Sequence, residues 1–531
     1  MLQKFSLLLT LSLAASLPAQ TPAPPSETRA AQAFEAARRA GPLALHAFLE
    51  KMPKGADLHM HLSGAVYAET FLKDAVDDNL CVDPVKHAFA KPTGSVCPAE
   101  AIPIASAFKD QNLYDALVDA FSMRSFVPSS GISGHDQFFA TFDRFGGLNK
   151  SHNGEWLDEV ATRAAAQSEQ YLEVMMTPSF TKAATLGYQL GWPVPVVPVS
   201  GSDTSATPAP SGASRAELAT LRGKLLAGGL RDEVQTDRAE LDAALADRNK
   251  IEHCGEPAAT PACSVQIRII YQVLRAFPPQ QVFAQTLLAF EVASTDPNVV
   301  GLNFVQPEDA YMTMSEYHRQ MLMLDYLHSV YPQVHISLHA GELAPGIVPP
   351  PGLRFHIREA VDLGHAERIG HGVDIMYETD PKLLLRELAD RHVMVEINLT
   401  SNDAILGITA PNHPLPLYRA AHVPVALSTD DEGVSRIDLT HEYTRAALDY
   451  KLSYEDLKQM VRTGLEHTFL PGPSLWQKPD DFTHIVAACA NQPLGAETPK
   501  PSCLSYLKDS PHAAQQWELE HRYRAFEQSL P

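Results

Sequence analysis

The chain has 531 residues, of which 45% are hydrophobic and 20% charged, a composition typical of a globular protein with enough apolar material for a large core. The formal net charge is -21 and no run of lysine and arginine stands out, which argues against nucleic acid or an anionic membrane as partner. A neutral or cationic small molecule is therefore the expected ligand.

The N-terminus has the three parts of a secretory signal. Met1-Leu2-Gln3-Lys4 is positively charged, the run from Phe5 to Ala15 is apolar, and Ser16-Leu17-Pro18-Ala19-Gln20 supplies small residues. The apolar run is too short to span a bilayer. We therefore expect residues 1–19 to be a signal peptide and the mature protein to be exported, to a periplasmic or extracellular location.

Six cysteines follow the signal in three sequence-local pairs. In an exported protein this spacing favours three disulfides that close short loops, with free buried thiols as the alternative. The expected pairing joins neighbours: Cys81 with Cys97, Cys254 with Cys263, and Cys489 with Cys503.

Short segments rich in apolar and β-branched residues predict eight buried strands, which in chain order are 57–61, 171–176, 265–271, 299–305, 335–339, 368–371, 393–398 and 423–429. Single helical patterns separate the later ones, over 279–292, 314–330, 353–363, 381–391 and 414–421. This alternation predicts an α/β fold, a (β/α)8 TIM-type barrel whose ligands bind at the carboxyl ends of the strands. A doubly wound sheet is the alternative, but no Gly-rich phosphate loop follows any strand.

The rest of the chain is predicted to decorate this barrel. Its expected divisions are a tether with two short helices over 20–51, the barrel over 52–470 with a helical section at 104–167 and an insertion at about 186–263, and a C-terminal extension over 471–531. The insertion contains a Pro/Ser/Thr-rich stretch, 197–214, which favours a loosely held loop.

Metal-binding residue types stand at the ends of several predicted strands. His59 and His61 alternate with apolar residues, so both imidazoles point to the same face of the first strand. His339, His371 and the pair Asp430-Asp431 follow later strands. A polar edge-strand face explains His-x-His alone, and a helix cap explains Asp-Asp alone. Their joint occurrence at strand ends favours a metal site with His59, His61, His339 and Asp430 as ligands.

These motifs, His-x-His at 59–61, His-Ala-Gly-Glu at 339–342, Gly-His-Gly at 370–372 and Thr-Asp-Asp at 429–431, resemble those of the adenosine deaminase family of metal-dependent amidohydrolases. Met52-Pro53-Lys54-Gly55 before them resembles the secreted, growth-factor-type branch, also called adenosine deaminase-related growth factors. The resemblance extends over about residues 52–435.

The resemblance implies one Zn2+ per chain and hydrolytic deamination of adenosine or 2'-deoxyadenosine to inosine or 2'-deoxyinosine and ammonia. It assigns Glu342 to protonation of purine N1, His371 to orienting and helping to deprotonate the water, and Asp431 to binding the base near N7. The expected substrate contacts are His61, Ser63, Gln306 and Asp431. The partner is then a small purine nucleoside, and a homo-oligomer is compatible with the sequence.

Two positions depart from the family pattern. Ser63 stands where family members that bind the ribose 5'-hydroxyl usually have Asp, and Gln306 stands where they usually have Gly. No lysine follows the fourth predicted strand, which argues against the bridged two-metal site of related amidohydrolases. A non-catalytic extracellular nucleoside-binding module and an amidohydrolase acting on another aminopurine are the alternative functions.

Overall fold

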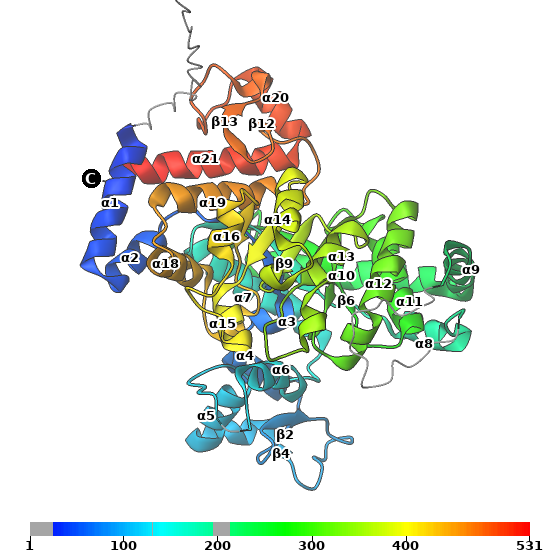
Figure 1. The fold of residues 1–531 in the computed structure, drawn as a ribbon. Helices are drawn as coiled ribbons and strands as arrows, with labels where there is room; N and C mark the ends of the chain where they lie inside the picture. The colour runs from blue at the N-terminus through cyan, green and yellow to red at the C-terminus, as the bar shows by residue number, and fades with distance from the viewer. Residues whose placement is uncertain (1–24, 130, 195–212, 531) are drawn as a thin grey trace, which may run out of the picture.

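The computed structural model describes residues 25–129, 131–194 and 213–530 (Figure 1). The predicted signal peptide and most of the Pro/Ser/Thr-rich stretch lie outside the described residues. Within them, the chain is an eight-stranded parallel barrel surrounded by helices, with additions at both ends of the chain.

All eight predicted barrel strands are confirmed, because each expected segment contains one. They are β1 (Gly55–His61), β5 (Glu169–Met176), β6 (Gln266–Leu274), β7 (Val299–Val305), β8 (His335–Ala340), β9 (Arg368–His371), β10 (Met394–Ile397) and β11 (Val425–Leu427). They pair in that order in parallel register. The ring closes where the Asp430 N–H donates to His59 O at 2.8 Å and the His61 N–H donates to Asp430 O at 3.3 Å.

Helices surround the strands, as the alternating pattern predicts. Those that follow barrel strands are α8 (Thr181–Leu190), α11 (Pro279–Ala293), α12 (Tyr311–Val330), α13 (His356–Asp362), α14 (Pro381–Asp390), α15 (Leu399–Leu406), α16 (Leu415–Ala420), α17 (Glu432–Ser435), α18 (Leu439–Asp449) and α19 (Tyr454–Glu466). The insertion contributes α9 (Arg215–Leu225) and α10 (Arg231–Ile251). Helix α13 begins three residues later than predicted, because a separate 3-10 turn occupies Pro350–Leu353.

The section between β1 and β5 is helical, as expected, but it is broken into short pieces. These are α3 (Leu62–Ala65), α4 (Ala68–Asp77), α5 (Gln111–Ala120), α6 (Gly134–Arg144) and α7 (Asn153–Ala166). A small sheet of β2 (Cys81–Asp83), β3 (Ala88–Ala90) and β4 (Ile102–Pro103) precedes α5. Its strands have two or three residues, too few for an alternating pattern to predict them.

The two ends of the chain pack together. Helices α1 (Pro25–Ala40) and α2 (Pro42–Leu49) meet at Gly41, where the sequence predicts the break, and α1 lies beside the end of α21 (Pro511–Ser529) (Figure 1). Lys458 on α19 lies 2.6 Å from Glu527 and 3.4 Å from Glu27, so its charge joins both terminal helices to the barrel. The extension also holds a hairpin that we did not predict, β12 (Trp476–Lys478) and β13 (Asp481–Ile485), and α20 (Pro501–Asp509).

The predicted disulfide pairing is confirmed. Cys81 bonds Cys97, Cys254 bonds Cys263, and Cys489 bonds Cys503. Each bond closes a short loop, and all three lie in additions to the barrel. None of the helices in the described part of the chain is long and apolar enough to cross a membrane.

Ion pairs fill the barrel interior below the strand ends. Arg368 is 1% exposed and lies 2.6 Å from Glu173 and 2.7 Å from Glu396, while its guanidinium stacks on the Phe469 ring at 3.9 Å. Glu396 contacts His59 Nδ1 at 2.6 Å. An unpaired buried charge is costly, so the four groups stay in contact. This series of contacts, from Glu173 through Arg368 and Glu396, holds the His59 side chain in one position.

Lys54, just before β1, is a buried lysine that links three segments. Its ammonium is fully buried and donates to Leu49 O at 2.6 Å, Met52 O at 3.2 Å and Gln167 O at 2.5 Å. Burial lowers the pKa of Lys54 to about 8, so the side chain remains charged at neutral pH.

We predict that Lys54→Met lowers the free energy of unfolding by about 1–3 kcal/mol, because it leaves buried carbonyls without a donor. The thermal midpoint measured at neutral pH should fall accordingly. Lys51→Met is the matched control, since Lys51 is exposed. Equal midpoints for the two variants would show that Lys54 does not hold these segments together.

Candidate active site

The structure brings together four potential metal ligands from three places in the barrel. His59 and His61 come from β1, His339 from β8, and Asp430 from the residue pair after β11. Their donor atoms all lie within 4.8 Å of one another, and all four residues are buried. His61 Nε2 lies 3.2 Å from His339 Nε2 and 3.3 Å from Asp430 Oδ1, and His59 Nε2 lies 3.5 Å from Asp430 Oδ1.

These separations fit a tetrahedral zinc site. Zinc bonds histidine nitrogen and carboxylate oxygen at about 2.0–2.1 Å, and a tetrahedron with such arms has edges of about 3.3–3.4 Å. The three measured donor separations lie close to that edge length. In the described chain, His59 Nε2 is buried without a hydrogen-bond partner. A cation is the group that satisfies several converging lone pairs at once.

Each ligand is oriented by a contact to its other polar atom. His59 Nδ1 contacts Glu396, and His339 Nδ1 contacts Asn303 Oδ1 at 2.8 Å. His61 Nδ1 contacts the side-chain amide of Gln272, and Asp430 Oδ2 accepts from Ser401 Oγ at 2.6 Å. Such partners hold the Nδ1 side of each ring and leave Nε2 directed at the common centre, as metal-binding histidines require.

The electrostatics of this cluster favour a bound positive charge. Burial alone would lower the pKa of His59, but the Asp430 and Glu396 carboxylates outweigh it and raise the pKa to about 10. Burial lowers the pKa of His61 and of His339, which keeps both rings neutral. The four donors therefore attract one cation, and a metal ion competes with the proton on His59 for that place.

The three residues expected to do the chemistry lie beside the ligands. His371 Nδ1 lies 3.6 Å from Glu342 Oε1, and His371 Nε2 lies 3.9 Å from Asp430 Oδ2. Burial, and next the charge of Asp430, raise the pKa of Glu342 and of Asp431 well above the usual carboxyl range. Glu342 Oε1 and Asp431 Oδ1 have no hydrogen-bond partner in the described chain. Both side chains are therefore neutral and free to bind a ligand.

His371 is held by two amides. Asn402 Nδ2 lies 3.0 Å and Asn398 Nδ2 lies 3.2 Å from His371 Nδ1. His413 Nδ1 accepts the Leu415 N–H, so His413 donates from Nε2 to Asn402 Oδ1, which fixes the Asn402 amide as a donor to His371. Burial lowers the pKa of His371 to about 3. The neutral ring therefore carries its proton on Nε2, facing Asp430.

Three residues with positive φ angles lie at the same strand ends. Gln306, His371 and Asp430 have φ angles of 94°, 70° and 62°, a region that residues with a side chain rarely adopt. Gly64 is required here, because a Cβ at this position would lie 1.5 Å from Asp431 Oδ1. The surrounding barrel holds these conformations.

The two departures from the family pattern lie at the rim. Ser63 is exposed on α3. Gln306 takes a glycine-like φ, and its side-chain oxygen accepts the Ala276 N–H at 2.8 Å, so the side chain is tied to the loop after β6. The structure does not bring Ser63 or Gln306 into contact with the four ligands.

Sequence analysis missed four residues that orient the ligands: Glu396, Asn303, Gln272 and Ser401. Three of them are polar residues inside predicted strands or directly after one, where apolar residues were expected. Buried polar residues at such positions usually satisfy another buried polar group. Glu396, Asn303 and Gln272 could have been identified in this way, because each is polar at or directly after a position where a buried strand residue was expected. Ser401 lies farther from the predicted strands and has no such feature.

The start of helix α6 contacts loops at the carboxyl ends of two barrel strands. His135 Nε2 contacts Asp309 Oδ1, after β7, at 3.0 Å. At the neighbouring residue, a Cβ on Gly134 would lie 1.9 Å from Ala404 O, after β10. The first turn of α6 therefore packs between loops that follow strands three places apart in the ring.

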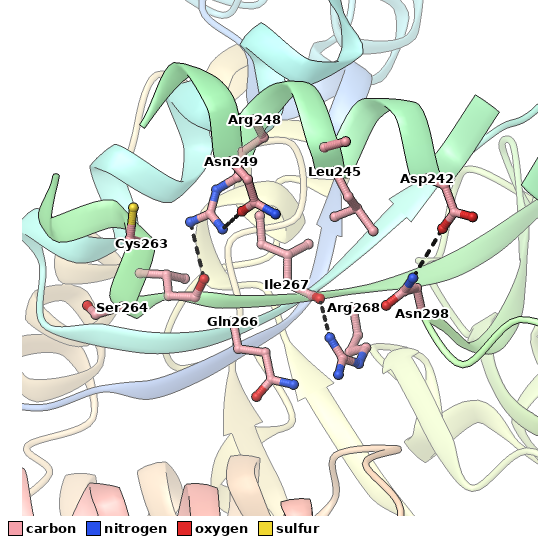
Figure 2. Close-up of a pocket in the computed structure, with 12 residues that line it drawn as sticks. Asp242, Leu245, Arg248, Asn249, Cys263, Ser264, Gln266, Ile267, Arg268 and Asn298 are labelled. Atoms are coloured by element: carbon pink, nitrogen blue, oxygen red, sulfur yellow. Dashed lines mark hydrogen bonds between the residues drawn. The ribbon is translucent and has the colours of Figure 1, made fainter. Parts of the chain in front are cut away.

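A polar groove of about 530 Å³ lies elsewhere, at the amino end of β6 (Figure 2). It is lined by α10 residues such as Asp242 and Arg248 and by Gln266 and Arg268 of β6. The ligand cluster lies at the carboxyl ends of the strands, where Gln272 of β6 meets His61. The groove is therefore not the active site.

Comparisons with known proteins agree with this geometry. Residues 246–477 match the family model for adenosine deaminase. An adenosine deaminase of Escherichia coli (strain SMS-3-5 / SECEC) is 39% identical over 139 residues, which are 26% of this chain and 38% of that enzyme. The chain thus spans about two fifths of the length of the curated relatives it matches.

Solved structures were also compared with this chain, and one with a similar fold is related to it at low sequence identity. A zinc-bound amidohydrolase from Burkholderia ambifaria has a TM-score of 0.50 and 17% identity, over 80% of this chain and 88% of that one. Arabidopsis ADAL complexed with IMP has a TM-score of 0.47 and 19% identity, over 80% and 93% of the two chains. Residues 246–477 of this chain are thus similar to the adenosine deaminase family, and the fold is similar to that of the amidohydrolase from Burkholderia ambifaria.

Proposed function

We propose that this protein is a zinc-dependent hydrolase that deaminates adenosine or 2'-deoxyadenosine to inosine or 2'-deoxyinosine and ammonia. The observation that carries the proposal is the convergence of His59, His61, His339 and Asp430 at tetrahedral spacing, with neutral Glu342 beside them. The zinc bound by the Burkholderia ambifaria relative supports the same metal here, and we propose one ion per chain.

A zinc ion held by these ligands would act as a Lewis acid that makes hydroxide available near neutral pH. Water would add to C6 of the purine as Glu342 donates its proton to N1, and the proton that the water loses returns to Glu342. The proton of the new C6 hydroxyl passes to the amino group, which leaves as ammonia, and C6 keeps the oxygen as a carbonyl. The raised pKa of Glu342 keeps the proton for N1 available. Asp431, which is also neutral, donates a hydrogen bond to N7.

The tautomer of His371 refines its expected role. Because its Nδ1 accepts from the Asn402 amide, its Nε2–H points toward Asp430 and the position of the attacking water. The ring therefore orients the water by donating to it. In the resting state Nε2 already carries a proton, so orienting the water is the better-supported part of the role that the resemblance implies.

The direct test is to load the full chain with one equivalent of zinc and incubate it with adenosine, 2'-deoxyadenosine, adenine and AMP. We expect inosine or 2'-deoxyinosine and an equal amount of ammonia from the two nucleosides. Release of ammonia only from adenine or AMP would assign the enzyme to another aminopurine. Binding of adenosine without turnover by zinc-loaded protein would favour a nucleoside-binding module.

We also propose that the protein is exported and belongs to the secreted growth-factor-type branch. The signal-like N-terminus, Met52-Pro53-Lys54-Gly55 and the three disulfides support this proposal. Mass spectrometry of the native protein should find a mature N-terminus near Gln20 and no free thiol. An intact Met1 together with six free thiols would contradict export.

We predict that His59→Ala loses both bound zinc and turnover, because three remaining ligands hold the ion less well. Metal analysis of the purified variant, alongside His392→Ala, measures the effect. His392 is half-exposed and pairs with Asp480, so its variant should retain about one equivalent of metal. A His59→Ala protein with full metal and activity would exclude His59 as a ligand.

We predict that Glu342→Gln retains zinc but loses on the order of a hundredfold or more in kcat, because the amide has no proton to transfer. Glu367→Gln, at a half-exposed carboxylate paired with His335, is the control and should turn over normally. Near-normal turnover by zinc-loaded Glu342→Gln would remove Glu342 from the mechanism.

A further inference from the structure

The turn that carries Glu342 is held by a second buried carboxylate, Glu308, in the loop after β7. Glu308 is 2% exposed. Its Oε2 accepts the Gly341 N–H and its Oε1 accepts the Glu342 N–H, each at 3.0 Å. One carboxylate thus binds two successive backbone amides, and one of these amides belongs to the proposed proton donor.

A third loop holds the same turn from the other side. Gly341 has a φ of 79°, and its carbonyl oxygen accepts the N–H groups of Val373 at 2.8 Å and Asp374 at 3.2 Å. A Cβ at Gly341 would lie 2.4 Å from Asp374 Oδ1. The backbone of the turn therefore has little freedom, whereas Glu342 Oε1 has no hydrogen bond that would fix the side chain. The side chain takes its position from the backbone.

Arg275 connects Glu308, and so the hydrogen bonds that hold the Gly341-Glu342 turn, to the proposed metal ligand His339. Its guanidinium is fully buried, lies 3.8 Å from Glu308 Oε1, and donates to His339 O at 3.3 Å. The Arg275 carbonyl accepts from Gln320 Nε2 at 2.9 Å, which anchors the arginine in turn. The positions of His339 and Glu342 are thereby linked through one buried ion pair.

We propose that Glu308 is a positioning residue that holds Glu342 in line with the purine ring through the Gly341 and Glu342 amides. This inference rests on the proposed function. Its physical basis is that a proton donor must lie within hydrogen-bond reach of its acceptor, and that a displacement of about 1 Å can cost on the order of a hundredfold in rate. The carboxylate of Glu308 binds backbone amides and lies outside the cluster of four proposed ligands.

The two hydrogen bonds that Glu308 accepts from the Gly341 and Glu342 amides can be tested without an activity measurement. Glutamine has one acceptor oxygen in place of two, so Glu308→Gln leaves one of the two amides without a partner. In hydrogen exchange followed by mass spectrometry, the peptide containing Gly341 and Glu342 should exchange about tenfold faster in this variant. Unchanged exchange at these two amides would overturn the proposal.

The matched control is Glu233→Gln in the insertion. Glu233 is also buried, and its two oxygens accept the successive N–H groups of Lys182 at 2.8 Å and Ala183 at 2.5 Å. Its variant should accelerate exchange at Lys182 and Ala183 and leave Gly341 and Glu342 unchanged. Faster exchange at Gly341 and Glu342 in both variants would indicate general loosening and would overturn the proposal.

A double-mutant cycle tests the functional part. Glu308→Gln should lower kcat on the order of tenfold or more at unchanged zinc content and similar KM. In a Glu342→Gln background the same change should cost nothing further, because the residue through which it acts is already lost. Losses that multiply would show that Glu308 acts independently of Glu342 and would overturn the proposal.

Glu308→Asp is a second variant, which keeps the proposal testable if Glu308→Gln does not fold. It keeps the buried negative charge beside Arg275 but is one methylene shorter, so it should fold, hold zinc, and still show faster exchange and a lower kcat. Wild-type exchange and kcat in Glu308→Asp would overturn the proposal. If the wild-type protein deaminates none of the purines, the proposed function fails. The exchange experiment still decides whether Glu308 holds the Gly341 and Glu342 amides.

Discussion

Three imidazoles and a carboxylate that converge in a buried space impose the main constraint on this structure. Lone pairs held 3.2–3.5 Å apart repel one another unless a cation lies between them. The barrel supplies the required rigidity, since β1 and the end of β11 are neighbours where the ring closes and β8 lies on the opposite side of the ring. The closing contacts between β1 and Asp430 are therefore part of the fold and part of the site.

The charges below the ligands follow from the same constraint. Arg368 balances Glu173 and Glu396, and Glu396 in turn orients His59. Burial disfavours each of these charges alone, but the alternating signs make the series favourable. Beside the ligands, burial and the charge of Asp430 outweigh the opposing charge of His59, so Glu342 and Asp431 stay protonated. One barrel thus holds an ionised carboxylate, Glu396, beneath the four candidate ligands and two neutral carboxyls, Glu342 and Asp431, beside them.

The sequence predicts the barrel, and it also points to the four residues that cluster at the strand ends, because both features obey local rules. Buried parallel strands are short apolar runs, and residues at their carboxyl ends must meet at one face of the barrel. The His-x-His of β1 is visible for the same reason. We did not predict the short strands β2, β3 and β4 or the hairpin of β12 and β13. Each of these strands has only two to five residues and is held by neighbouring loops, so its sequence shows no alternation of apolar and polar residues.

Positions set by tertiary contacts were not predictable. Glu308 looks like an ordinary loop residue until the fold places it under the Gly341-Glu342 turn. Gln306 replaces an expected glycine, yet keeps a φ of 94° because β7 and the loop after β6 hold it there. Ser63 differs from these residues, because it is exposed and no tertiary contact within the described part of the chain fixes its side chain. Its contact to the sugar therefore stays a prediction.

The most direct measurement is anomalous diffraction at the zinc edge from crystals of the zinc-loaded full chain. The account predicts one strong peak, bonded to His59, His61, His339 and Asp430, with no second peak in the barrel. Two peaks at the strand ends, or a single peak away from these four residues, would contradict it.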